Sequence, residues 1–323
     1  MELNIMAVGK NTTLDPSVIW DSVIVGGGPA GYNAALYMIR KGLKPLVILS
    51  ERGGQVALTN EIDNYLGMDL IHGTDMTEAF HKHVARFDVD ILENTAVTSV
   101  HKVDHQFELK LSNHEIVKSK TVIIATGGEH RKLNVEGEGE YEGKGVSYCA
   151  ICDAPFFKDK EVVIVGGGDS AVEAAIDLSK WATHVHVVQR STFRADQILL
   201  DKMFELKNVT YELGSIVTEI KGADDVSSVM IYNKDKDTHE KRNVGGIFIE
   251  IGQDPRSDLV KDLVKCNSQG EIIVNAHKET SLSGLYAAGD VTNAPFKQII
   301  TAAADGAIAA LSASQYIMKD EEK

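Results

Sequence analysis

Two cysteines separated by two residues, Cys149 and Cys152, carry the clearest chemical signal in the chain, and Asp153 follows them directly. This spacing allows a disulfide, and it also occurs in redox motifs and in half of many zinc sites. Zinc needs about four ligands, and the remaining cysteine, Cys266, has no partner in its own stretch of sequence. The pattern therefore favours a redox-active pair over a metal site. Asp153 suits two roles, as an acid beside a departing sulfur or as a helix cap.

Two glycine-rich turns, each between a strand-like run and a helical run, predict two sites for dinucleotides. The first is Gly26–Gly31 and the second is Gly166–Ala171. In the first, Gly26 permits a tight turn, Gly28 lets backbone N–H groups reach a pyrophosphate, and Gly31 lets the helix pack on the strand. The helix N-terminus then faces the anion. The turns start 140 residues apart (166 minus 26), so the chain repeats one nucleotide-binding architecture.

The order of the predicted elements indicates an α/β fold with two Rossmann-like domains of the three-layer ββα type, the second inserted in the first. A length of 323 residues also predicts two domains. The tail carries one more strand and an alanine-rich helix but no sheet of its own, so we expect it to return to the first domain. The expected domains are 1–128 with 251–323, and 129–250. Three β-like stretches, near 89–92, 95–103 and 106–111, predict a meander on one face of the first domain.

Composition narrows the class of partner. The formal net charge is −14, from 33 Lys and Arg against 47 Asp and Glu, which argues against nucleic acid and against anionic membranes. No apolar run approaches the roughly 20 residues of a spanning helix. The lead-in at 1–19 lacks the layout of a signal peptide, so we expect a cytoplasmic protein. Three cysteines are too few for a framework of structural disulfides.

The chain carries a series of motifs that, in their order along the sequence, resemble those of the low-molecular-weight thioredoxin reductases. These are class II of the FAD-dependent pyridine nucleotide-disulfide oxidoreductases, and the resemblance covers essentially the whole chain. Close relatives of that family include the flavoprotein reductases of bacterial peroxiredoxins. The matching motifs are the two glycine turns, Gly53-Gly54-Gln55, Thr126-Gly127, the Cys149 to Asp153 stretch, and Gly289-Asp290 followed by Lys297-Gln298. Any one of them is weak alone, whereas all of them in order are specific.

The resemblance implies a thioredoxin-disulfide reductase that acts as a homodimer on thioredoxin or a thioredoxin-like protein. A hydride would pass from NADPH to FAD, and the electrons would then reduce a Cys149–Cys152 disulfide. Cys152 would be the flavin-proximal sulfur, Cys149 the interchange thiol and Asp153 the acid. FAD would be held by the first domain, at Gly26, Gly28, Gly31, Gln55, Asn64, Thr126, Gly289, Asp290 and Gln298. NADPH would be held by the second, at Gly168, Asp169, Ser170, Ala171, Arg190 and Arg194.

The expected NADPH site departs from the family's pattern. Family members that use NADPH carry His-Arg-Arg-x-x-x-Arg after the second strand of the inserted domain. Here the corresponding residues are Val188, Gln189, Arg190 and Arg194. Two arginines remain for a 2′-phosphate, and Gln189 lacks the acidic charge with which NADH-preferring relatives repel that phosphate. We therefore expect NADPH, with NADH as the alternative.

Other functions stay open at this level. An NADH-dependent reductase of a peroxiredoxin or glutaredoxin-like carrier shares the same motifs. A ferredoxin-dependent flavin thioredoxin reductase is a further alternative, against which the intact second glycine turn argues. A non-catalytic nucleotide-sensing module with a structural cysteine pair is a third. If the main interpretation holds, the nicotinamide site and the cysteine pair must reach one flavin in turn. We therefore hypothesise a rotation of the inserted domain, with hinges near 127–129 and 252–255.

Overall fold

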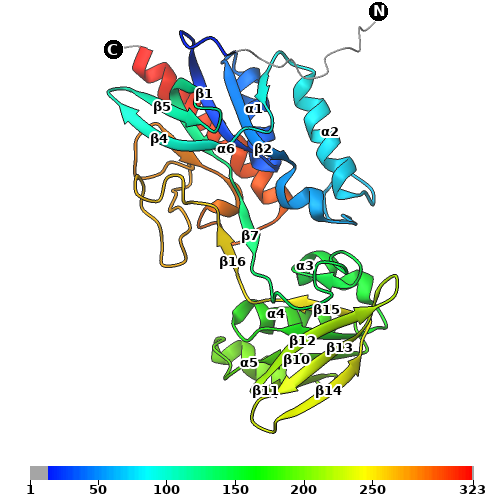
Figure 1. The fold of residues 1–323 in the computed structure, drawn as a ribbon. Helices are drawn as coiled ribbons and strands as arrows, with labels where there is room; N and C mark the ends of the chain where they lie inside the picture. The colour runs from blue at the N-terminus through cyan, green and yellow to red at the C-terminus, as the bar shows by residue number, and fades with distance from the viewer. Residues whose placement is uncertain (1–13, 322–323) are drawn as a thin grey trace, which may run out of the picture. The chain divides into compact units, whose positions relative to one another are not determined.

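The computed structural model describes residues 14–321, so the first thirteen residues of the expected lead-in lie outside the described residues. The chain divides into two compact units, one formed by residues 1–129 and 254–323 and the other by residues 130–253. It passes between them twice, through the short strands β7 (Gly128–His130) and β16 (Gln253–Pro255), which pair with each other (Figure 1).

The first unit is built on a sheet with the strand order β3-β2-β1-β6-β5-β4, to which β17 adds by pairing with β6. Its parallel strands are β1 (Ile19–Gly27), β2 (Pro45–Arg52), β3 (Asp90–Leu92), β6 (Ile116–Ile124) and β17 (Leu285–Ala287). Strands β4 (Val97–Val103) and β5 (Gln106–Leu111) form an antiparallel hairpin, and β5 pairs with the beginning of β6.

One expectation for this sheet was wrong. The stretch near residues 89–92 belongs to no meander, because β3 pairs with β2 in parallel. A helix between two strands carries the chain back to the same end of the sheet, so the strand that follows it pairs in parallel. The meander instead consists of β4, β5 and the first part of β6.

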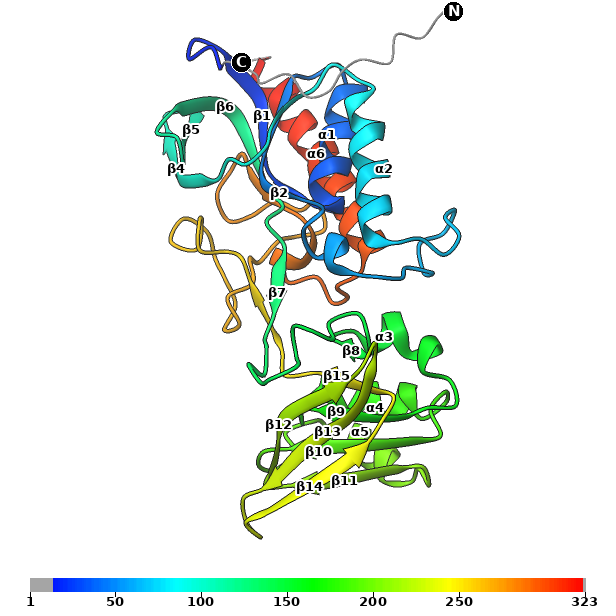
Figure 2. The ribbon, with the colours of Figure 1, turned by 45° about the vertical axis from the view of Figure 1, so that its right-hand side comes forward.

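Alternate residues of β1 explain the layers of the first unit. Val23 and Val25 belong to a core shared with the β4–β5 hairpin and the tail, whereas Ile24 belongs to a second core shared with the helices, as expected for side chains that alternate across a strand. Figure 2 shows the helices gathered on one face of the sheet and the hairpin on the other. These helices are α1 (Pro29–Arg40), α2 (Gly73–Ala85) and α6 (Ile299–Glu321), with the 3₁₀ turns η1 (Gly54–Leu58) and η3 (Gly289–Val291).

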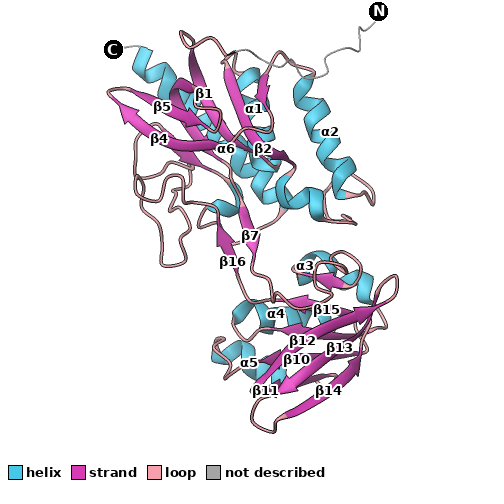
Figure 3. Ribbon diagram, viewed as in Figure 1, coloured by secondary structure: helices cyan, strands magenta, loops and turns pink. Residues whose placement is uncertain are grey.

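The second unit repeats this plan. Its parallel sheet has the order β11-β10-β9-β15-β8, with β8 (Val146–Ser147), β9 (Glu161–Val165), β10 (His184–Gln189), β11 (Val209–Leu213) and β15 (Gly246–Ile249). Its helical elements are α3 (Ala150–Asp153), η2 (Ala154–Phe157), α4 (Asp169–Leu178) and α5 (Gln197–Phe204). An antiparallel sheet of β12 (Ser215–Gly222), β13 (Val226–Asn233) and β14 (Thr238–Asn243) completes it (Figure 3).

Strand β9 divides its side chains as β1 does. Ile164 packs in a core with α4 and α5, and Val163 and Val165 pack in a core with β12 and β13. The α/β class and the two Rossmann-like units expected from the sequence are confirmed. Among residues 14–321, no helix is both long enough and apolar enough to cross a membrane.

Candidate redox site and nucleotide-binding turns

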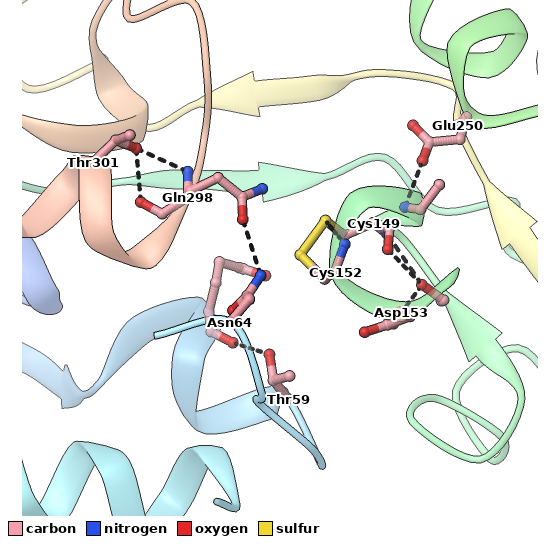
Figure 4. The surroundings of a disulfide bond; sticks show 11 residues. Thr59, Asn64, Cys149, Cys152, Asp153, Glu250, Gln298 and Thr301 are labelled. Carbon is pink, nitrogen blue, oxygen red and sulfur yellow. Dashed lines mark hydrogen bonds between the residues drawn. A yellow bond between two sulfur atoms is a disulfide. The ribbon is translucent and has the colours of Figure 1, made fainter. Parts of the chain in front are cut away.

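Cys149 and Cys152 are joined by a disulfide in the second unit, with their Cα atoms 5.3 Å apart (Figure 4). Cys149 is the N-cap of the short helix α3, and its Sγ atom accepts a hydrogen bond from the Cys152 N–H at 3.2 Å. Both cysteines are half-buried, and Ile151 between them is 63% exposed. The cysteine stretch is therefore partly exposed, as exchange with a second disulfide requires.

Asp153 is held toward the start of the cysteine stretch. Its Oδ2 atom accepts a hydrogen bond from the Ser147 hydroxyl at 2.6 Å, and the same hydroxyl oxygen accepts from the Cys149 N–H at 3.1 Å. Asp153 makes no side-chain capping hydrogen bond to the 3₁₀ turn that follows it. This geometry speaks against a cap on that turn, and the role of Asp153 as an acid stays a prediction.

A second carboxylate, Glu250, reaches the same stretch from the end of β15. Its Oε1 atom accepts a hydrogen bond from the Ala150 N–H at 3.3 Å (Figure 4). Burial, as the largest cause, raises the pKa of Glu250 to about 7. Sequence reasoning gave Glu250 no role, because nothing local links it to a residue 100 positions away.

The first glycine turn has the shape expected for a phosphate site. Gly26 has a φ of 124°, and a Cβ at Gly31 would stand 2.0 Å from the Gly26 carbonyl oxygen, so a side chain at Gly31 would force the helix away from the strand. At Gly28, by contrast, the nearest atom to a Cβ would be the Gly53 carbonyl oxygen, 3.9 Å away. Gly28 is also the N-cap of α1 and has no side-chain cap. The turn thus leaves room, and unclaimed N–H groups, for an anion.

The side chains expected around a flavin come from distant parts of the first unit. Asn64 Nδ2 donates to Gln298 Oε1 at 3.3 Å, which joins two of them across 234 residues (Figure 4). Gln55 lies half-buried in η1. Thr126 is turned differently, because its hydroxyl donates to the Arg256 carbonyl oxygen at 2.6 Å. The Thr126 side chain therefore ties two loops together, and its contact with a nucleotide stays a prediction.

The Gly289-Asp290 turn is braced by Lys297 of the Lys297-Gln298 motif and by two charged residues that sequence reasoning missed, Lys278 and Asp305. Asp305 of α6 forms an ion pair with Lys278 at 2.6 Å, and its other oxygen accepts from the Gly289 N–H at 3.4 Å. Both side chains of the pair are largely buried, at 14% exposed for Lys278 and 11% for Asp305. Lys297 donates to the carbonyl oxygens of Asp290 and Thr292. These contacts fix the backbone on which the Asp290 carboxyl is carried.

The second glycine turn also opens a helix without a side-chain cap. Gly168 is the N-cap of α4, and a Cβ placed on it would meet nothing within 4 Å. Asp169 Oδ1 accepts from the Asp196 N–H at 2.7 Å, so this carboxylate holds the loop after β10. Ser170 is exposed and Ala171 is buried against the sheet. This turn, like the first, suits the phosphates of a dinucleotide.

Gln189, at the end of β10, is committed to its own loop. It is 5% exposed, its Nε2 atom donates to the Thr192 carbonyl oxygen at 3.1 Å, and its Oε1 atom accepts from the Arg190 N–H at 2.8 Å. Arg190 and Arg194 are both exposed, and neither forms an ion pair within residues 14–321. At this end of the sheet the chain therefore offers two cations and no anion at position 189.

The remaining candidate chemistry is narrow. In the part of the chain that the structure describes, no group of three or more His, Cys, Asp and Glu residues is arranged to hold a metal ion. Cys266 is a free, half-buried thiol in the first unit, and burial raises its pKa. The cysteine pair and the two glycine turns thus remain the features on which an activity can be built.

Comparison with known proteins places these features in a family. Residues 20–306 match the family described as pyridine nucleotide-disulphide oxidoreductase. Among solved structures, a thioredoxin reductase from Streptococcus pyogenes MGAS5005 is 40% identical, with a TM-score of 0.88, over 93% of this chain and 99% of that chain.

Two curated relatives carry other names. A protein from Bacillus subtilis (strain 168) named NADH dehydrogenase is 39% identical over 93% of this chain and 59% of its own length. A protein from Staphylococcus aureus (strain MSSA476), named as the F subunit of alkyl hydroperoxide reductase, is 38% identical over 93% of this chain and 60% of its own length. The chain therefore spans about 60% of the length of these curated relatives.

Proposed function

The chain belongs to the pyridine nucleotide-disulphide oxidoreductase family, and we propose that it is a flavin-dependent thioredoxin-disulfide reductase. Electrons pass from NADPH through FAD to the Cys149–Cys152 disulfide, and from there to the disulfide of thioredoxin or a thioredoxin-like protein. The observation that carries the proposal is the disulfide itself, formed at CxxC spacing in the unit that holds the second glycine turn. We further propose that the enzyme is a cytoplasmic homodimer.

Membership of the family implies FAD and a pyridine nucleotide, and the two turns fit such groups. The uncapped start of α1, with open space at Gly28, suits the pyrophosphate of FAD. In this proposal Gln55, Asn64, Thr126, Asp290 and Gln298 complete the FAD site. When bound, FAD provides the two-electron chemistry that links a nicotinamide to a disulfide. The first unit is then the FAD-binding domain and the second the NADPH-binding domain.

The residues of the cysteine stretch have distinct tasks. Two electrons break the Cys149–Cys152 bond, and one sulfur takes up a proton while the other stays a thiolate. Cys149, the interchange thiol, attacks one sulfur of the partner's disulfide, and a mixed disulfide forms as the partner's other sulfur leaves as a thiolate. Cys152 then attacks Cys149, which restores the disulfide and releases the reduced partner. Asp153, fixed by Ser147, gives a proton to the departing sulfur in the proposed scheme.

In the proposed function the two exposed arginines recognise the 2′-phosphate of NADPH. Arg190 and Arg194 can each give bidentate hydrogen bonds to a phosphate. The amide of Gln189 is engaged with Thr192 and Arg190 and contributes no charge against the 2′-phosphate. Gly168, Asp169, Ser170 and Ala171 form the start of α4, where the pyrophosphate of this nucleotide belongs.

A second candidate function has a specific observation in its favour. The curated relatives are named NADH dehydrogenase and the F subunit of alkyl hydroperoxide reductase, which supports an NADH-linked reductase that serves a peroxiredoxin or a glutaredoxin-like carrier. The chain spans about 60% of the length of those relatives, so the activities in their names enter here as a candidate function only.

Steady-state assays separate the two candidates. The wild-type holoenzyme is assayed with NADPH or NADH against thioredoxin, a peroxiredoxin and a small dithiol carrier. The proposal predicts turnover with NADPH and thioredoxin, and its loss in Cys149→Ser and Cys152→Ser. Cys266→Ser, which changes the free thiol of the other unit, is the matched control and should turn over normally. Turnover that survives in Cys149→Ser would contradict the proposal, and turnover with NADH and the peroxiredoxin alone would favour the second candidate.

A further inference from the structure

Glu250 lies between the second glycine turn and the cysteine pair. Its side chain accepts the Ala150 N–H at 3.3 Å, and Ala150 is the first residue of α3, directly after Cys149. Its backbone borders the glycine turn, because a Cβ at Gly166 would stand 2.2 Å from the Glu250 carbonyl oxygen. The end of β15 therefore places a carboxyl group one peptide unit away from Cys149.

The surroundings of Glu250 allow its charge to change near neutral pH. Burial raises the pKa of Glu250 to about 7, the Ala150 N–H opposes this, and the carboxylate of Glu173 on α4 adds to it. Asp153, the other carboxyl group of the cysteine stretch, is bonded to Ser147. A cation, Arg131, lies near the chain that follows Glu250. A Cβ built on Gly252, two residues beyond Glu250, would lie 3.4 Å from a guanidinium nitrogen of Arg131.

We propose that Glu250 is a positioning residue for the cysteine pair. Its side chain holds the Ala150 amide, and its charge sets how readily Cys149 ionises after reduction. The inference rests on the proposed function, since it concerns the dithiol that such a reductase forms. Reduction breaks the sulfur–sulfur bond, places two electrons on the sulfurs and adds one proton to each sulfur that becomes a thiol. A Cys149 thiolate is disfavoured beside an ionised Glu250 and is favoured beside a neutral one. Exchange proceeds through the thiolate, so Glu250 tunes the reactivity of Cys149.

The test measures alkylation of Cys149 by iodoacetamide in the reduced full-length protein, with the labelled peptide quantified by mass spectrometry. Glu250→Gln removes the charge but keeps an oxygen that can accept the Ala150 N–H. We expect the ratio of variant to wild-type rate to be near one at about pH 6 and about three- to tenfold at about pH 8. Glu161→Gln, an exposed change at the start of β9, is the matched control and should leave the ratio near one at both pH values. If the alkylation rate of Glu250→Gln relative to wild type were the same at both pH values, the inference would be overturned.

A second variant separates charge from hydrogen bonding. Glu250→Leu removes both, so its alkylation should show the same pH-dependent gain as Glu250→Gln together with a lower midpoint of thermal unfolding. A lower midpoint without that gain would mean that Glu250 only supports the structure, and the inference would fail. The measurement needs neither nucleotide nor protein acceptor. Failure of the proposed function would appear elsewhere, as a Cys149–Cys152 disulfide that NADPH does not reduce in the wild-type holoenzyme.

Discussion

The Ser147 hydroxyl donates to Asp153 Oδ2 at 2.6 Å, and its oxygen accepts the Cys149 N–H at 3.1 Å. One small side chain thereby fixes both the first cysteine and the carboxyl group that follows the second. Because Ser147 ends β8, which pairs with β15, this arrangement is anchored in the parallel sheet. The position of the proposed acid is thus set by the sheet rather than by the short helix alone.

The first prediction concerns Asp153 as the proton donor. In Asp153→Asn the amide cannot supply a proton, so reduction of the acceptor should slow by about 10² to 10⁴. Reduction of the flavin by nucleotide should be unchanged. Stopped-flow absorbance resolves the two half-reactions. Ser147→Ala, which leaves the carboxyl group in place but unanchored, should slow acceptor reduction less. Equal rates for Asp153→Asn and wild type would remove Asp153 from the proposed scheme.

The second prediction concerns the choice of nucleotide. Arg190→Ala combined with Arg194→Ala removes the two exposed cations near Gln189, and KM for NADPH should rise about 10- to 100-fold while KM for NADH stays the same. Steady-state kinetics with each nucleotide is the measurement. Lys202→Ala, which changes an exposed cation of α5 in the same unit, should alter neither constant. An equal rise of KM for both nucleotides would argue against 2′-phosphate recognition by these arginines.

The third prediction concerns the buried ion pair behind the Gly289-Asp290 turn. Asp305→Asn leaves Lys278 without its partner at a site where both side chains are largely buried, so it should destabilise the protein by about 3–5 kcal/mol and increase the Kd for FAD. Denaturant unfolding and fluorescence titration of the apoprotein with FAD are the measurements. Asp258→Asn breaks an exposed pair with Lys261 and should leave the stability almost unchanged. Similar effects of the two substitutions would refute the assigned role of Asp305.

The fourth prediction concerns acid sensitivity of the second unit. Burial, reinforced by Arg242, lowers the pKa of His186 to about 4. The unfolded chain takes up a proton near pH 6.5 and the folded chain does not, so stability is lost as the pH falls between these values. For a shift of this size the loss is about 3 kcal/mol. Unfolding free energies at pH values across that range should fall less in His186→Val than in wild type. His239→Val, at an exposed position of β14, should keep the wild-type slope.

Local spacing was sufficient to predict the parts of the site that lie within one turn of chain. The two glycine turns and the cysteine pair could be read from the sequence because a tight turn, a helix start and a disulfide each depend on residues a few positions apart. The fold class followed from the same repeat. The residues that Glu250 and Asp305 contact lie elsewhere in the chain, as with the 100-residue separation of Glu250 and Ala150, and only the packed structure reveals them.

Two further features of the first unit also depend on distant partners. The strand β3 pairs in parallel with β2 because a helix separates them, whereas its place as the first of three successive β-like stretches suggested a meander. Thr126 follows a strand as expected, but its hydroxyl bonds to the carbonyl of Arg256, 130 residues away. In both cases a partner distant in sequence determines the outcome, and local pattern carries no information about it.

The most direct test of the account is an anaerobic titration of the FAD-loaded protein with NADPH, and separately with NADH, with flavin absorbance followed and free thiols counted afterwards. The chain has three cysteines, of which Cys266 is free and the other two form the disulfide. The account predicts that NADPH bleaches the flavin and that, once the added equivalents are consumed, Cys149 and Cys152 become free thiols beside Cys266. A flavin bleached by either nucleotide with Cys266 still the sole free thiol would contradict it.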